Sequence, residues 1–164
     1  MFVTNHVLSG VIVGRLFRRR PLTAFAVGLV SHLALDAVPH WGCDLKSPED
    51  RLLFLRYARR DGLLGIATGL FAAGAVGRDA RPATVAAITG AVLLDADKPI
   101  LHFWGRDPFP NVISRIHGRV QNESPHGMPN ELAFGIACAL ADVFVAARSR
   151  RRPSSNDALA ARNL

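Results

Sequence analysis

The segment that decides the fold is GLLGIATGLFAAGAVG, residues 62–77, which contains no charged side chain. Its apolar residues do not alternate with polar ones, as they would along a half-buried strand, so the segment is predicted to be a helix. A helix on the surface of a soluble protein needs a polar stripe that faces water, and this segment offers only Thr68. We therefore expect an apolar helix that is surrounded by protein or lipid.

Four further segments have the same apolar character, at residues 7–17, 22–38, 83–94 and 132–147. Pro21, Pro82 and Pro129 stand close to the start of three of them, where proline is common because the first turn of a helix leaves its amides unpaired. The length of 164 residues suits one domain. The sequence predicts an all-α fold, a bundle of about five short apolar helices within residues 1–147, followed by a basic disordered tail at residues 148–164.

Helices without a polar face cannot all be hidden in a domain of this size, because some element must form its surface. We therefore expect the bundle to be embedded in a membrane with lipid as its partner, although each segment is shorter than the roughly 20 apolar residues of a typical span. The spacings Gly10-x-x-x-Gly14 and Gly65-x-x-x-Gly69 favour close approach of helix backbones in a bilayer.

Two segments between the apolar helices have a different composition. Ser47-Pro48-Glu49-Asp50 has the pattern of a capped helix start, and the following RLLFLRYARR mixes apolar residues with arginine, as is typical of a helix at a membrane interface. Residues 98–130 are rich in Pro, Gly, His and Asn, and they predict an irregular His-rich loop with at most short helices. Within this loop, His102 beside Phe103-Trp104 predicts an anchor at the membrane interface.

Charged residues sort toward two ends of the predicted bundle if consecutive segments form hairpins. One end receives the arginines of residues 18–20, of residues 78–81 and of the tail, whereas the other end receives most of the histidines and carboxylates. Arginine and lysine favour the cytoplasmic side of a membrane. We therefore expect the arginine-rich end on the inner face of a bacterial-type cytoplasmic membrane and the opposite end facing outward.

The strongest candidate for chemistry is SHLALDAVPH, residues 31–40. His32 and Asp36 are four residues apart, so both side chains project from one face of a helix. An imidazole nitrogen and a carboxylate oxygen at that spacing can bind one divalent cation, and His40 can add a further ligand. A structural hydrogen bond between His32 and Asp36 is the alternative, but ionisable residues within lipid are costly and favour a functional role.

Two other clusters are expected at the same end of the bundle. Asp95 and Asp97 follow the segment at residues 83–94, where the helix dipole disfavours negative charge and a cation would be stabilising. The third cluster lies at residues 117–126, with Glu131 beyond it. Because a metal ion needs three or four protein ligands, their convergence predicts a centre for divalent metal, with zinc as the expected ion and room for two or more ions. The candidate metal ligands are His6, His32, Asp36, His40, Asp95, Asp97, His117, Glu123 and His126.

The order of these motifs resembles a known family. The motifs are Thr4-Asn5-His6-x-Leu8-x-Gly10, the His32 and Asp36 pair followed by Pro39-His40-Trp41, Leu94-Asp95-x-Asp97, and the late His/Glu loop. Together they are similar to those of bacterial integral-membrane proteins predicted to be metal-dependent hydrolases, a family distantly similar to the all-helical zinc-dependent phospholipase C enzymes. The resemblance covers residues 4–131 and implies metal ligation by His6, His32, Asp36, Asp95 and Asp97, with His40 in addition.

We therefore expect a membrane-associated, metal-dependent hydrolase that acts on a phosphoester, such as that of a lipid headgroup, through a water activated by the metal. Asp36, Asp95 or Asp97 would orient that water or accept its proton, and Arg119 would hold a phosphate. The alternative is a non-catalytic integral-membrane scaffold or binding protein, in which the His and Asp pairs are structural hydrogen bonds.

Composition excludes some other classes. Two cysteines, Cys43 and Cys138, cannot form the disulfide framework of a small secreted scaffold. The net charge of +7 suits a nucleic-acid binder, but the arginines stand in short runs at helix ends and in the tail, and the chain has only two Trp and one Tyr for stacking. No nucleic-acid partner is expected. Asp142, alone in an apolar segment, is either a buried ligand or a partner of Arg15.

Overall fold

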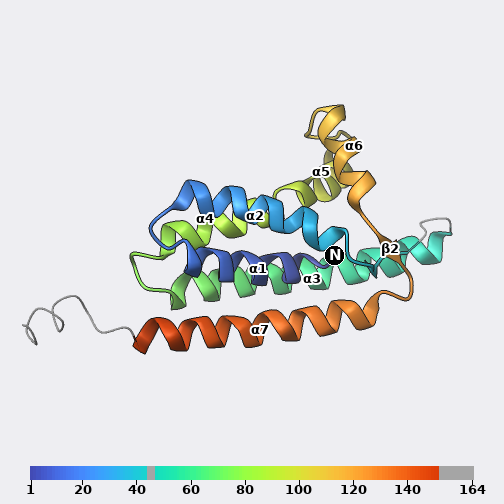
Figure 1. Ribbon diagram of the computed structural model, residues 1–164. Helices are drawn as coiled ribbons and strands as arrows, with labels where there is room; N and C mark the ends of the chain where they lie inside the picture. Colours follow the sequence, from blue (N-terminus) through green and yellow to red (C-terminus); the bar gives the residue numbers. More distant parts are fainter. Residues whose placement is uncertain (44–46, 152–164) are drawn as a thin grey trace, which may run out of the picture.

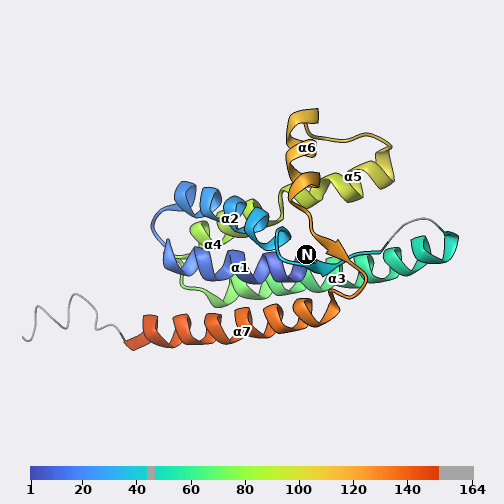
Figure 2. The ribbon, with the colours of Figure 1, turned by 45° about the vertical axis from the view of Figure 1, so that its right-hand side comes forward.

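The computed structural model describes residues 1–43 and 47–151, apart from the side chains of residues 149–151, and this part of the chain is almost entirely helical (Figures 1 and 2). The predicted all-α fold is confirmed. The elements are α1 (Val3–Leu16), α2 (Pro21–Asp36), α3 (Pro48–Ala75), α4 (Arg81–Val92), the short 3-10 helix η1 (Leu94–Ala96), α5 (Asp97–Trp104), α6 (Asn111–Val120) and α7 (Met128–Arg151). Two-residue strands, β1 (His40–Trp41) and β2 (Glu123–Ser124), pair in parallel.

Most of each predicted apolar segment lies in a helix, namely α1, α2, α3, α4 and α7, although four of the segments run one or two residues past the end of their helix. Helix α3 is longer than expected, because residues 51–60 and the apolar segment that follows form one continuous helix. The predicted loop at residues 98–130 contains most of α5 and all of α6. Helix α7 continues through Arg151 into the predicted tail, whose remaining residues, 152–164, lie outside the described part of the chain.

Local sequence signals account for several helix boundaries. The Ser47 hydroxyl accepts a hydrogen bond from the Asp50 amide at 3.0 Å, while the Asp50 carboxylate accepts one from the Ser47 amide at 3.3 Å. This reciprocal capping box starts α3 as predicted. Pro21 opens α2, and Pro82 lies in the first turn of α4. Helix α5 ends at Gly105, whose positive φ of 68° is a left-handed conformation that favours glycine at a helix end.

Small residues bring α2 and α4 into backbone contact at the centre of the bundle. A Cβ atom at Gly28 would lie 2.3 Å from the carbonyl oxygen of Ala87, and one at Gly90 would lie 2.2 Å from the carbonyl oxygen of Phe25. Neither position has room for a methyl group, because its neighbour is backbone and cannot rotate away. The close packing of these helices therefore depends on glycine at both positions.

The two predicted small-residue spacings differ in how tightly they pack. Cβ atoms at Gly10 and Gly14 would lie 2.8 and 2.3 Å from Cα atoms of α4, so these glycines do allow close approach of α1. Gly65 and Gly69 of α3 instead face side chains of α1, at 3.2 and 3.7 Å. The first spacing is thus a backbone contact, and the second is a looser side-chain contact.

The outside of the bundle is strongly apolar, with exposed large side chains on every bundle helix, including Leu16, Leu22, Val30, Leu70, Phe71, Val85, Leu132 and Phe144. Monomeric soluble proteins rarely expose apolar surface this widely. Among the described helices, only α7, over Met128–Arg148, is long and apolar enough to cross a membrane, and 11% of its most apolar stretch is buried. With 14, 16 and 12 residues, α1, α2 and α4 are shorter than a typical span of roughly 20 residues.

The five long helices lie side by side, and the chain turns at two opposite ends of the bundle (Figure 1). The α1–α2 turn, the α3–α4 turn and the end of α7 lie at one end, which carries the arginines of residues 18–20 and 78–81. The chain start, the end of α2, η1 and the two short strands lie toward the other end. For the described residues, the predicted separation of the arginine-rich turns from a histidine-rich end is confirmed, while most of the tail lies outside them.

Candidate metal centre

Four buried side chains from three parts of the chain meet at the histidine-rich end. His32 and Asp36 come from the last turns of α2, Asp95 from η1, and His117 from α6. Each residue offers one potential ligand atom, and the four atoms all lie within 4.8 Å of one another. A buried His32/Asp36/Asp95/His117 group therefore exists that can hold a metal ion.

Three of these ligand atoms form a nearly equilateral triangle. His32 Nε2 and His117 Nε2 are 3.1 Å apart, and each lies 3.2 Å from Asp36 Oδ2. Tetrahedral zinc with bonds of about 2.0–2.1 Å separates its nitrogen and oxygen ligands by about 3.3 Å. The triangle therefore has the size of one face of such a coordination shell.

A hydrogen bond at the outer ring nitrogen of His32 leaves a lone pair facing this triangle. The Nδ1 atom of His32 donates to the Ala91 carbonyl at 2.7 Å, because a carbonyl oxygen can only accept. In the neutral ring, Nε2 is then an unprotonated ligand atom. His117 Nδ1 likewise lies 3.4 Å from Asp97 Oδ2. Such outer partners are typical of metal-binding histidines, whose ring orientation they fix.

The second oxygen of Asp36 faces a different set of groups. Asp36 Oδ1 lies 3.2 Å from His6 Nε2 and accepts a hydrogen bond from the Met1 amino group at 2.7 Å. His6 Nε2 is also 3.7 Å from Asp95 Oδ2, and its ring stacks on His32 with centroids 4.1 Å apart. Among the described residues, Asp95 Oδ2 and His6 Nδ1 are buried without a hydrogen-bond partner. Asp36 therefore connects two neighbouring sets of ligand atoms.

Charges around the group are coupled. Lys98 Nζ lies 2.9 Å from Asp95 Oδ1. Burial alone would raise the pKa of the Asp95 carboxyl and lower that of Lys98. Their ion pair outweighs burial, so the pKa of Asp95 is lowered and that of Lys98 is raised. Burial also disfavours the charged form of His117, yet its bonds to Asp36 and Asp97 outweigh this effect and raise its pKa to about 9. The carboxylates of the group thus stabilise positively charged neighbours.

The parallel pairing of β1 and β2 holds α6 beside α2. His40 N donates to the Asn122 carbonyl at 3.0 Å, and Asn122 N donates to the Asp36 carbonyl at 2.9 Å. These bonds attach the chain just after α6 to the end of α2, so that His117 reaches the group. Gln121 Nε2, one helical turn beyond His117, lies 3.2 Å from His117 Nε2. A spacing of four residues on a helix is the signal for this neighbour, although Gln121 was not among the predicted site residues.

Two acids from distant helices fix the start of α1, which carries His6. Both carboxylate oxygens of Glu131 accept from the Phe2 amide, at 3.1 and 3.0 Å, and one accepts from Asn5 Nδ2 at 2.7 Å. The Asp61 carboxylate accepts from the amides of residues 3 and 4. Carboxylates at this position satisfy unpaired amides and interact favourably with the helix dipole. The sequence did not indicate Asp61.

Several predicted site residues lie outside the group that the described residues form. His40, Glu123 and His126 contribute no ligand atom to it. The His40 ring is held by the Val38 carbonyl at 2.8 Å, while Glu123 and His126 are exposed. Asp97 supports His117 from outside. His40 and Glu123 are instead partners in the β1–β2 pairing.

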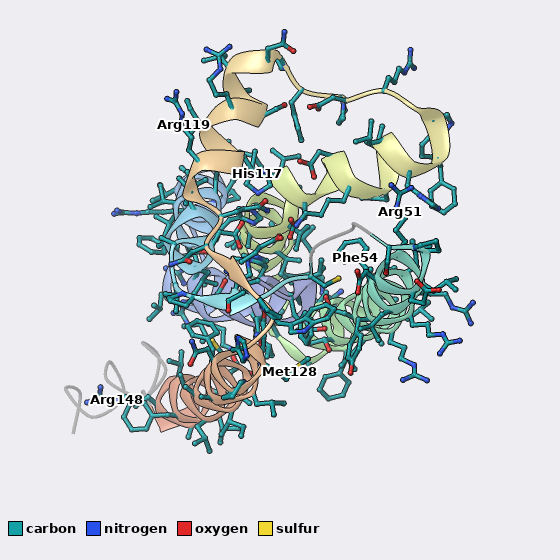
Figure 3. All side chains as sticks on the ribbon, turned by 90° about the vertical axis from the view of Figure 1, so that its right-hand side faces the viewer. Arg51, Phe54, His117, Arg119, Met128 and Arg148 are labelled. Atoms are coloured by element: carbon teal, nitrogen blue, oxygen red, sulfur yellow. The ribbon has the colours of Figure 1, made fainter. Side chains whose placement is uncertain are left out.

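The structure also places Arg119, Asp142 and Cys43. Arg119 is exposed and projects outward from α6, whereas His117 on the same helix is buried (Figure 3). Asp142 pairs with Arg15, with Nε and Oδ1 2.5 Å apart, which decides between the two predicted roles. Cys43 is half-buried and contributes no atom to the group.

Comparisons with known protein families, with curated proteins and with solved structures find no match for this chain. The geometry of the group is therefore the basis for any functional conclusion.

Proposed function

We propose that the protein is a membrane-associated, metal-dependent hydrolase of phosphoesters, with its metal centre at His32, Asp36 and His117. The triangle of ligand atoms with edges of 3.1–3.2 Å carries this proposal. Two imidazole nitrogens and one carboxylate oxygen are typical zinc ligands, and a metal ion would displace the proton that His117 favours at neutral pH. The resemblance of the motif order to predicted membrane-bound hydrolases points to the same chemistry.

A second ion would have a set of ligands at His6, the other oxygen of Asp36, and Asp95. These groups are buried, and the unpartnered lone pairs of His6 and Asp95 are costly unless a cation or proton satisfies them. A carboxylate with one oxygen in each ligand set suits a pair of neighbouring ions. We therefore propose zinc or a similar divalent metal with up to two ions.

Divalent cations at this position would supply a water that is acidic near neutral pH and positive charge for the phosphoryl oxygens. Side chains of the protein would accept the proton of that water and bind the phosphate. Asp97 is half-buried, its Oδ1 atom has no hydrogen-bond partner among the described residues, and its other oxygen supports His117. Asp97 is thus suited to accept a proton from the attacking water. Lys98 is a cationic side chain in direct contact with the group and is better placed than Arg119 to bind a phosphate.

Lipid is proposed as the surrounding medium because exposed apolar side chains occur on every bundle helix. Arg15 and Asp142 pair between α1 and the apolar helix α7, which is how polar residues are accommodated within a bilayer. A lipid phosphoester is then the substrate class closest to the centre. Under the tendency for arginine to be cytoplasmic, the centre would face outward from an inner membrane.

The test is metal analysis of the purified protein together with hydrolysis of phosphatidic acid vesicles, followed as phosphate release. We expect bound zinc or a similar metal in the wild type and loss of activity with a chelator. Asp36→Asn should lower metal affinity by more than about 100-fold, the upper end of the cost of removing an outer-shell partner of a ligand. Asp142→Asn removes a carboxylate far from the centre and should retain the metal.

Three outcomes would contradict the proposal in whole or in part. A wild-type protein that binds no divalent metal would favour the non-catalytic scaffold, in which His32 and Asp36 are structural. The same conclusion follows if Asp36→Asn and His117→Ala both keep the metal content of the wild type while thermal unfolding shows that they are folded. Metal binding without phosphate release would retain the metal centre and overturn the proposed reaction.

A further inference from the structure

Helices α5 and α6, with their connection, form an arm at residues 97–120 that leaves the bundle beside the metal centre (Figures 1 and 2). In both views the arm extends to the side of the bundle, and α6 runs across the direction of the long helices. If the long helices stand upright in a bilayer, the arm therefore extends along its surface.

The arm exposes large apolar side chains instead of packing them. No residue of α5 is buried, and His117 is the only buried residue of α6. Phe103 and Trp104 are 73% and 68% exposed. The full set of large exposed apolar residues on the arm is Leu101, Phe103, Trp104, Val112, Ile113 and Ile116. Water is an unfavourable environment for such a set, so another apolar phase is needed to cover it.

Basic side chains accompany this apolar surface. Arg106, Arg115 and Arg119 are all exposed. The one acid between residues 101 and 120 is Asp107, which accepts hydrogen bonds from the Phe109 amide at 2.8 Å and the Ser114 hydroxyl at 2.6 Å. Both helices are amphipathic, unlike the long helices of the bundle. Basic amphipathic helices with aromatic residues bind at the boundary between lipid headgroups and acyl chains.

We propose that the arm binds an anionic lipid surface, with Trp104, Phe103 and Leu101 in the acyl-chain boundary and the arginines at the lipid phosphates. This inference rests on the membrane location in the proposed function and assigns a separate surface to it. The positive charge of the arm favours this occupant, because the exposed arginines of two copies facing each other would repel. Trp and Phe at the headgroup level, on the helix that begins at Asp97, would keep the metal centre close to lipid phosphoesters.

The test uses the two tryptophans of the chain, Trp41 and Trp104, in the full-length protein. Trp41→Phe leaves Trp104 as the only indole, and Trp104→Phe leaves Trp41, which packs 4.7 Å from the Tyr57 ring. The proteins are reconstituted into vesicles of phosphatidylglycerol and phosphatidylcholine, with bromine near the headgroup end of the phosphatidylcholine acyl chains. Trp104 emission should fall about twofold, because interfacial helices are buried to about 5–10 Å. It should also be shielded from iodide in the water.

Each other outcome would overturn the inference. Strong iodide quenching of Trp104 without quenching by brominated lipid would place the arm in water. Protection from both quenchers, together with a doubled mass in detergent, would show that a second copy covers the arm. If Trp41→Phe does not fold, the difference in quenching between the wild type and Trp104→Phe gives the Trp104 signal. Metal content measured on the same vesicles separates failure of this inference from failure of the metal centre.

Discussion

The contact between α2 and α4 in the bundle differs from the arm in how closely its glycines pack. In the bundle, Gly28 and Gly90 stand against backbone atoms of a neighbouring helix with no room for a Cβ atom. In the arm, a Cβ atom at Gly105 or Gly118 would have no neighbouring heavy atom within 4 Å. The bundle is therefore a tightly packed support, and the arm is loosely held to it. The candidate metal centre takes His32 and Asp36 from the support and His117 from the arm.

The largest change in the free energy of unfolding should come from Gly28→Ala in the bundle, with Gly118→Ala in the arm as the comparison. Gly28→Ala places a Cβ atom 2.3 Å from the Ala87 carbonyl oxygen, so α2 and α4 must separate. We expect a loss of about 3 kcal/mol in the free energy of unfolding, at the upper end of the usual cost of overpacking. Gly118→Ala meets no neighbour and should stabilise α6 by up to about 1 kcal/mol. Thermal unfolding in detergent measures both, and equal effects would refute the difference in packing.

An intermediate change in stability should distinguish substitutions of His32 and His117, the two histidines of the triangle. His32 is fully buried, donates to Ala91 and stacks on His6, so His32→Ala leaves a cavity in the support. We expect it to cost about 2–3 kcal/mol in metal-free protein. His117→Ala removes a ligand from the arm and should cost at least about 1 kcal/mol less, since the arm can adjust. Both variants should lower zinc affinity by at least about tenfold.

Unfolding and zinc titration on the same preparations would check this pair. A large loss of metal-free stability in His117→Ala would mean that the arm belongs to the cooperative unit of the bundle. Unchanged zinc affinity in either variant would remove that histidine from the centre.

The smallest effect should come from the outer face of the arm. Phe103 is 73% exposed, so Phe103→Ser should change the free energy of unfolding in detergent by less than about 0.5 kcal/mol. The matched change in the support, Val11→Ser, affects a side chain that is 2% exposed and should cost several times more. A similar cost for both would show that the arm has packing partners that the described residues do not reveal.

Local patterns predicted much of this molecule. The apolar segments indicated the five long helices, and the four-residue spacing of His32 and Asp36 placed both in the buried group. The assumption of helical hairpins was enough to bring Asp95 to the same end. These predictions succeeded because helix periodicity and short turns are set by residues close in sequence.

Contacts between distant residues were harder to predict. Asp61 accepts hydrogen bonds from the first amides of α1 because α3 passes the start of that helix. No pattern in the sequence around Asp61 predicts this contact. His40 is adjacent to the His32 and Asp36 motif in sequence, but pairing with the chain after α6 holds its ring at the Val38 carbonyl. The interface segment at residues 51–60 was predicted as a separate helix, although Gly62 does not interrupt α3. Tertiary context decided each of these cases.

The position of the Asp36 carboxylate affects how two metal ions would bind to the centre. Asp36 presents one oxygen to His32 and His117 and the other to His6, so the charge of this carboxylate is shared between both sets of ligands. The first cation to arrive would neutralise that charge, and a second would meet a weaker attraction together with the repulsion of the first. Loading with two ions would then proceed in two separate steps, tight and then weak.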